Sequence, residues 1–249
     1  MLKDYLKIPK NELYEILIIS FVLSLMFGLT FVRFSSTSVS FSANFLMFFL
    51  FLFLLMLLRI MFMKMIAYRN GFSISMKMTY FDRYWFREYD RVSYDFKGIR
   101  GIPMPFLSLI IYILTLGSLI LPTLWRYDYK IIPHRHIGTW LKYEPDLMEG
   151  VSNYRFSKAM FGGFLFYAIT ALVLKAFNNF FGEYFYWFIF IIFWIAFFNL
   201  IPIIGCEGWE FFMRGKFGWV SSLTILVLTL ISVLLFNSVL YVISMGLVS

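Results

Sequence analysis

Five long apolar runs constrain this chain more than any other feature. They lie at 13–33, 43–66, 157–177, 183–204 and 218–244. Each run has the roughly 20 residues that a helix needs to cross the hydrocarbon core of a bilayer. Only 14% of the residues are charged, whereas a soluble domain averages about 25%. The sequence therefore predicts an all-α polytopic membrane protein, with 1–249 as a single integral membrane domain.

A sixth apolar run, 104–124, decides the predicted topology. It contains two prolines and a central glycine, so it could either span the membrane or return as a re-entrant or interfacial hairpin. If it returns, 20 of the 22 lysines and arginines share one side, and only Arg33 and Lys175 lie on the other. The positive-inside rule favours this arrangement. We therefore expect about five transmembrane helices, a hairpin at 104–124 and a cytoplasmic N-terminus.

The two longest polar segments, 67–103 and 125–156, fall on the predicted cytoplasmic side. Within the first, residues 73–80 alternate small or polar side chains with apolar ones. This period of two is typical of a strand with one buried face. The sequence thus predicts a small cytoplasmic β layer beside the membrane helices.

The apolar run that begins near Tyr184 ends in an unusual way for a membrane span. Its last residues, 198–208, read FNLIPIIGCEG. Pro202 prevents a regular helix from continuing, while Asn199 and Glu207 bring an amide and a carboxylate to or near membrane depth. Such groups require partners there, because hydrocarbon offers none. A broken helix is therefore expected to present polar groups inside the protein.

This stretch resembles the third-ligand segment of the site-2 proteases, a family of intramembrane zinc metalloproteases. The shared pattern is N-L-x-P, followed after four residues by an acid and a glycine. In the family the acid is normally Asp and binds zinc, and here it is Glu207. The resemblance implies that Asn199, Pro202 and Glu207 border a substrate or partner, with Asn199 hydrogen-bonding an unwound peptide.

The rest of the family pattern is present without its chemical groups. The family's H-E-x-x-H helix continues into an Ala and, four residues later, a Gly, which match Ala67 and Gly71. Counting back places Arg59 and Met63 at the two zinc-binding histidines and Ile60 at the glutamate that activates water. None of these three side chains can do the corresponding chemistry. A glycine-rich segment, 155–165, resembles the opening of the family's next helix.

Two interpretations of the basic residues at the end of the second run remain open. Arg59 and Lys64 could extend to the lipid headgroups. Alternatively, Arg59 could point into the former zinc pocket and pair with Glu207, so that a guanidinium takes the place of the metal. The Phe-rich runs 48–53 and 185–198 are expected to face lipid or to pack between helices.

The predicted function is therefore that of a catalytically inactive, site-2-protease-like protein without a cofactor, located in the cell membrane of a microbe. Its predicted partners are membrane lipids and a transmembrane or juxtamembrane segment of another protein. No nucleotide motif is visible. The basic residues behind the net charge of +8 are expected to contact lipid headgroups rather than nucleic acid. One alternative is an active metallopeptidase with zinc rebuilt from Glu207, His134 and His136. Another is a small transporter or channel subunit.

Overall fold

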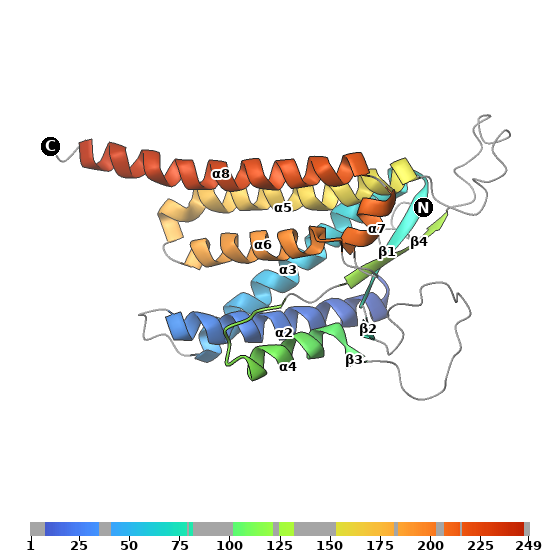
Figure 1. Cartoon of the computed structure of the whole chain (residues 1–249), viewed down its shortest axis with the longest axis horizontal. Coiled ribbons are helices and arrows are strands. Elements are labelled where there is room, and N and C mark those ends of the chain that lie inside the picture. Colours follow the sequence, from blue (N-terminus) through green and yellow to red (C-terminus); the bar gives the residue numbers. More distant parts are fainter. Residues whose placement is uncertain are drawn as a thin grey trace.

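The computed structural model describes residues 8–34, 41–78, 80–81, 102–121, 125–131, 153–181, 184–202, 207–214 and 216–246. Five long helices dominate this part of the chain and lie side by side (Figure 1): α2 (Lys10–Phe34), α3 (Phe41–Arg69), α5 (Asn153–Phe181), α6 (Tyr184–Leu200) and α8 (Lys216–Gly246). The predicted all-α membrane architecture is confirmed at this level, since four of these helices are long and apolar enough to cross a bilayer.

The fifth predicted span, 183–204, is shorter than expected. Helix α6 has 17 residues and ends at Leu200, so it measures about 25 Å against a hydrocarbon core of about 30 Å. Pro202 is not helical, in keeping with its missing amide hydrogen. After residues 203–206, the short helix α7 (Glu207–Arg214) occupies what was expected to be a loop.

The helices connect two distinct ends of the molecule. The β-strands, helix α7 and the beginning of α2 share one end, whereas α8 runs to the opposite end with the C-terminus (Figure 1). Helix α5 also begins at the strand end, and α6 returns to it. The described parts of the two polar segments, strands β1 and β4, therefore lie at one end of the bundle (Figure 1).

The run 104–124 is not a single helix within the residues described. Helix α4 (Met104–Leu114) follows strand β3 (Ile102–Pro103), and a turn at 115–117 leads into a non-helical stretch. Strand β4 (Trp125–Ile131) comes next and belongs to the β layer. Both ends of the segment therefore lie at the strand end, and its tip packs along α2.

Strands β1 (Phe72–Met78) and β4 form an antiparallel pair that makes up the larger part of the β layer. A second, shorter pair joins β2 (Tyr80–Phe81) to β3. The alternating pattern predicted at 73–80 corresponds to β1, whose apolar positions are buried. The outer edge of β1 is closed by α2, since Glu12 accepts the backbone N–H of Met76 at 2.8 Å and Glu15 accepts that of Met78 at 2.7 Å.

Helices α3 and α5 approach most closely at two adjacent glycines. A Cβ at Gly162 would lie 2.1 Å from Cδ1 of Ile66, and one at Gly163 would lie 2.7 Å from Sδ of Met63. Small residues permit such close approach of membrane helices. The Phe-rich runs also pack between helices, for example Phe51 stacked on Phe188 with ring centroids 4.1 Å apart.

Candidate functional site

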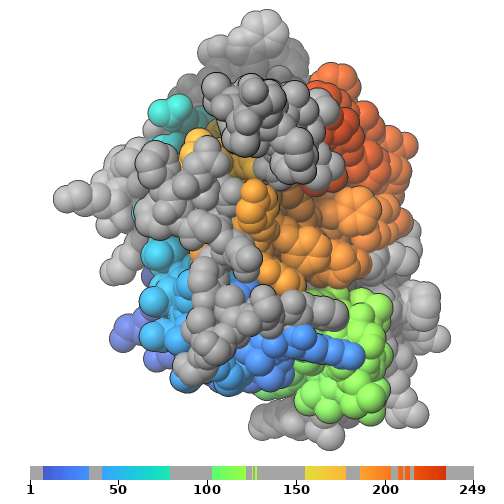
Figure 2. All heavy atoms as spheres, turned by 90° about the vertical axis from the view of Figure 1, so that its left-hand side faces the viewer, coloured from blue at the N-terminus to red at the C-terminus, as the bar shows by residue number. Residues whose placement is uncertain are grey.

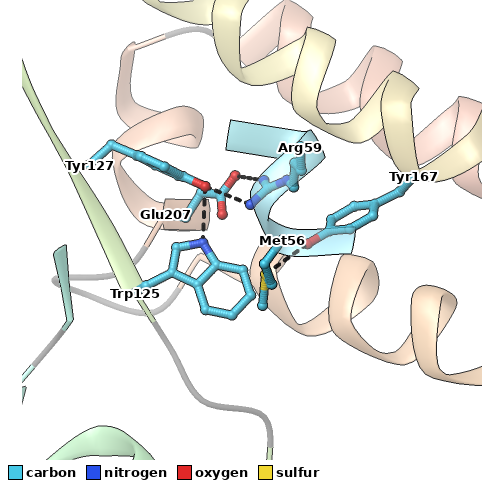
Figure 3. A network of polar contacts seen from close by, with 6 residues as sticks. All are labelled: Met56, Arg59, Trp125, Tyr127, Tyr167 and Glu207. Atoms are coloured by element: carbon cyan, nitrogen blue, oxygen red, sulfur yellow. Dashed lines mark hydrogen bonds and ion pairs between the residues drawn. The ribbon is translucent and has the colours of Figure 1, made fainter. Parts of the chain in front are cut away.

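A buried ion pair between Arg59 and Glu207 forms the centre of the candidate site (Figure 3). Arg59 comes from the second half of α3 and donates through Nη2 to Oε1 of Glu207, the first residue of α7. Both side chains are 0% exposed. Of the two interpretations of Arg59, the pair is therefore present and the extension to the headgroups is wrong.

Strand β4 supplies the second partner of the guanidinium. Nη1 of Arg59 donates to the hydroxyl of Tyr127 at 2.6 Å. The same hydroxyl accepts from Nε1 of Trp125 at 3.2 Å. Residues 125 and 127 lie on the same face of β4 because side chains alternate along a strand, and both are buried. Tyr127 thus links the β layer to the charged residue in the membrane helix.

Aromatic rings surround the guanidinium on several sides. Its Cζ lies 4.7 Å from the ring centroid of Tyr167, 5.6 Å from that of Phe164, and 5.7 Å from those of both Trp125 and Tyr127. Cation–π attraction is strongest where water is excluded, at about 2 kcal/mol or more per desolvated contact. These rings, which come from α5 and β4, therefore offset part of the cost of burying the charge.

Two of the three positions singled out in α3, Arg59 and Met63, lie against helix α5. Nε of Arg59 and Sδ of Met63 would lie 3.2 Å and 2.7 Å from a Cβ at Gly163. Arg59 and Met63 thus face α5 together, as residues four apart on a helix do. Ile60 is buried in the hydrophobic core. Gly163 lets α5 approach both side chains.

The end of α6 lies against the beginning of α7, next to Glu207. A Cβ at Gly208 would lie 2.3 Å from the carbonyl oxygen of Ile201 and 2.8 Å from that of Asn199, so only glycine fits. Trp219 of α8 donates to the carbonyl of Leu200 at 2.7 Å. The broken helix end is thus held against both α7 and α8.

The side chain of Asn199 is 1% exposed, and neither atom of its amide has a partner among the residues described. Nε of Arg59 and Oε2 of Glu207 are likewise without a partner there. Buried amides usually form hydrogen bonds, and an unmade one costs about 1–3 kcal/mol. Pro202, in contrast, is exposed.

Burial sets the protonation of the groups outside the spans. It raises the pKa of the Glu207 carboxyl above its ordinary value of 4.5, and contact with Arg59 opposes that rise. Burial also raises the pKa of Tyr127 well above 10.0, although Arg59 opposes this as well. Because a guanidinium does not lose its proton in proteins, an ionised Glu207 is the form that neutralises it, and Tyr127 remains a neutral hydroxyl.

A second buried ion pair lies nearby at the strand end. Nζ of Lys64 donates to Oε2 of Glu12, and the two side chains are 4% and 2% exposed. The expectation that Lys64 extends to the headgroups is therefore wrong, because a carboxylate from α2 reaches it inside the protein. The other carboxylate oxygen of Glu12 accepts the N–H of Met76.

Metal-ligating side chains do not gather in the described part of the chain. No group of three or more His, Cys, Asp or Glu side chains lies close enough there to hold an ion. His134, His136 and Cys206 lie outside the described residues. At Glu207, the side that faces α3 is taken by the cation Arg59.

Sequence reasoning identified the two charged residues of this site and missed the aromatic ones. Trp125, Tyr127, Phe164 and Tyr167 were not predicted as site residues. One signal was available in β4, where aromatic residues occupy alternate positions 125, 127 and 129. Comparisons with family models, curated proteins and solved structures found no match to this chain.

Proposed function

We propose that this chain is a catalytically inactive, site-2-protease-like protein of a microbial cell membrane that binds a transmembrane or juxtamembrane segment of a partner protein. The observation that carries the proposal is the ion pair of Arg59 and Glu207. It joins the position of the family's first histidine to that of its third ligand. A fixed organic cation thus stands where the resemblance would place zinc.

The chemistry of the pair supports an inactive site. A zinc-dependent hydrolase keeps an open coordination position for water and needs about three protein ligands. Here the pair is fully buried, and Arg59, Ile60 and Met63 provide neither a ligand of zinc's usual kind nor a general base. Restoring that chemistry would require both a new ligand set and removal of the guanidinium.

Asn199 supports the binding part of the proposal. Its amide offers one acceptor and two donor hydrogens, and it lies at the point where α6 ends and the chain turns. A peptide backbone in an extended conformation presents the complementary donor and acceptor. A partner segment that reached this point would satisfy both halves of the amide, so partner binding is expected to depend on Asn199.

A metal analysis tests the inactive site. We expect no zinc in the purified protein, and about one zinc per chain in the variant R59H/M63H/E207D, which restores three ligands. The matched control R59H/M63H/E207A lacks the third ligand and should bind zinc more weakly. Zinc in the unaltered protein that is lost on Glu207→Ala would overturn the proposal in favour of an active metallopeptidase. A folded R59H/M63H/E207D protein without zinc would contradict the resemblance.

Photo-crosslinking tests the partner. A crosslinking residue at the exposed Pro202 should form a defined adduct with a membrane protein, and the same residue at Phe217 of α8, which is 87% exposed, should not. Asn199→Leu should abolish the adduct, because it leaves the partner's backbone unpaired. Equal adducts at both positions, or full crosslinking in the Asn199→Leu protein, would count against partner binding at the broken helix.

A further inference from the structure

We infer that the segment from Met104 to Leu121 is a re-entrant hairpin that penetrates most of the bilayer beside α2, with its outward face in contact with lipid acyl chains. The proposal is independent of the partner-binding function. It rests on where the hairpin touches α2, on how its tip satisfies its own backbone, and on the absence of charge along it.

Contacts with α2 fix the depth of the hairpin tip, which is the turn at 115–117. The hydroxyl of Tyr112 lies 3.0 Å from Oγ1 of Thr30, and Thr30 already donates its hydrogen to a backbone carbonyl, so Tyr112 is the donor. Nη1 of Arg33 donates to the carbonyl of Leu116 at 2.7 Å. Both α2 residues lie close to the C-terminal end of that helix.

The two ends of the hairpin, in contrast, belong to the strand end of the molecule. The β layer is attached to the start of α2 through Glu12, and Thr30 lies 18 residue steps further along the helix. At 1.5 Å per residue this is about 27 Å, close to the thickness of the hydrocarbon core of about 30 Å. A hairpin that lay flat at the strand-side interface could not reach Thr30.

Chain length agrees with this depth. Eight residue steps separate Gly117 at the tip from Trp125 in β4, and an extended chain covers about 26–29 Å in that number of steps. Residues 119–121, which begin the return, are accordingly non-helical. A second helix of this length would cover less than half of the distance.

The N–H groups of the turn at the tip of the hairpin are paired within the protein. Helix α4 ends in a Schellman motif, in which Gly117 N–H donates to Tyr112 O at 2.8 Å and Leu116 N–H donates to Ile113 O at 3.0 Å. Leu116, at the C′ position, adopts the left-handed φ of 51° that this cap requires, and Gly117 follows with a φ of 77°.

The neighbouring amides of the tip are also satisfied within the hairpin. The N–H groups of residues 115 and 118 donate to backbone carbonyls, and that of Leu119 donates to Oγ1 of Thr115 at 3.2 Å. Five successive amides thus have internal acceptors, and Arg33 satisfies a carbonyl. Such pairing of turn amides within the protein is what hydrocarbon demands and what water does not.

The surface of the hairpin matches the same environment. Residues 101–124 contain no charged side chain. Leu114 and Leu116 are 76% and 82% exposed, and further apolar side chains of α4 face outward. Seen from the end at which α2 finishes, the hairpin lies at the periphery next to α2 (Figure 2). Acyl chains are the occupant that fits an uncharged apolar surface beside a membrane span.

Spin labelling in liposomes tests the inference. Single cysteines at Leu114 or Leu116, in a Cys206→Ser background, carry a nitroxide, and Lys10→Cys at the exposed start of α2 is the control. Collisions with oxygen, which dissolves in acyl chains, should dominate at residue 114. Collisions with a polar nickel chelate should dominate at residue 10, since polar solutes are excluded from hydrocarbon.

Thiol labelling supplies the sidedness. In sealed vesicles of one orientation, a membrane-impermeant maleimide on the side that modifies Lys10→Cys should react at least about tenfold more slowly with Leu116→Cys, because a thiol away from water forms less thiolate. Equal rates, or nickel collisions dominating at residue 114, would show an interfacial hairpin and overturn the inference. Low collision rates with both quenchers would show that protein covers the face, and would overturn the lipid contact.

Discussion

The buried ion pair predicts that its two residues respond differently to pH when each is removed alone. In the variant Arg59→Met, the carboxylate of Glu207 is left in a fully buried site. It can escape an unpaired charge by taking up a proton. In the variant Glu207→Gln, the guanidinium of Arg59 has no such route, although it keeps Tyr127 and the surrounding rings. Only the first variant should therefore regain stability in acid.

The magnitude follows from the ordinary pKa of a glutamate, 4.5. Protonating such a group at pH 7 costs about 3.4 kcal/mol, at 1.36 kcal/mol per unit. Breaking a buried ion pair lowers the free energy of unfolding by about 3–5 kcal/mol, and the protonation cost falls within that range. At pH 5 the protonation cost falls to about 0.7 kcal/mol. The variant carboxyl has a raised pKa in the folded state, so its penalty is present above pH 4.5 and is lost as the pH falls towards that value.

Unfolding in mixed micelles, measured for both variants and the unaltered protein at pH 7 and pH 5, tests this reasoning. The deficit of Arg59→Met should shrink by about 2.7 kcal/mol, which corresponds to about 5–11 °C in melting temperature for a chain of this size. The deficit of Glu207→Gln should not shrink. Equal pH dependence in the two variants would refute a buried, charge-compensated pair, as would full stability of Arg59→Met at pH 7.

Three further substitutions probe the same region through unfolding free energies. Gly163→Ala should lower the free energy of unfolding by about 1–3 kcal/mol, because the added Cβ meets the flexible side chain of Met63. Gly208→Ala should lower it further, because the Cβ there meets backbone carbonyls. In a double-mutant cycle, Met63→Ala should reduce the loss caused by Gly163→Ala. Tyr127→Phe removes the acceptor of two buried donors and should cost about 2–6 kcal/mol, and a cost below 1 kcal/mol would contradict the hydrogen bonds. Lys64→Met leaves the carboxylate of Glu12 without its cation and should destabilise the protein by about 3–5 kcal/mol at pH 7; equal stability would contradict a buried pair.

Much of the architecture could be predicted because membrane helices impose strong patterns. Length and polarity located the apolar helices, and the distribution of basic residues favoured a hairpin at 104–124, which stays a prediction. The boundary of α6 was missed because apolar residues continue past Leu200, although Pro202 marks where the helix must stop. Helix α7 was missed because eight residues carry too little periodicity to distinguish a helix from a loop.

The charged half of the site was open to prediction, since a buried carboxylate in a membrane protein needs a cation. Arg59 is near the end of an apolar run, and the family spacing placed it opposite Glu207. The aromatic half depends on tertiary register: β4 pairs with β1 across 46 intervening residues, from Met78 to Trp125. No local pattern sets which face of β4 meets α3, so Tyr127 could not be assigned.

The contacts of Arg59 explain how such a site can hold together without a metal. A structural or catalytic metal joins elements that are distant in sequence, because each ligand comes from a different segment. Arg59 does the same with a planar fork of donors: it joins α3 to α7 through Glu207 and to β4 through Tyr127, and it lies against Tyr167 of α5. A lysine at position 59 would retain the charge, but it lacks the planar fork with which Arg59 bonds to α7 and β4 at the same time. The guanidinium thus accounts for the way in which α3, α5, α7 and β4, which are distant in sequence, meet at one point.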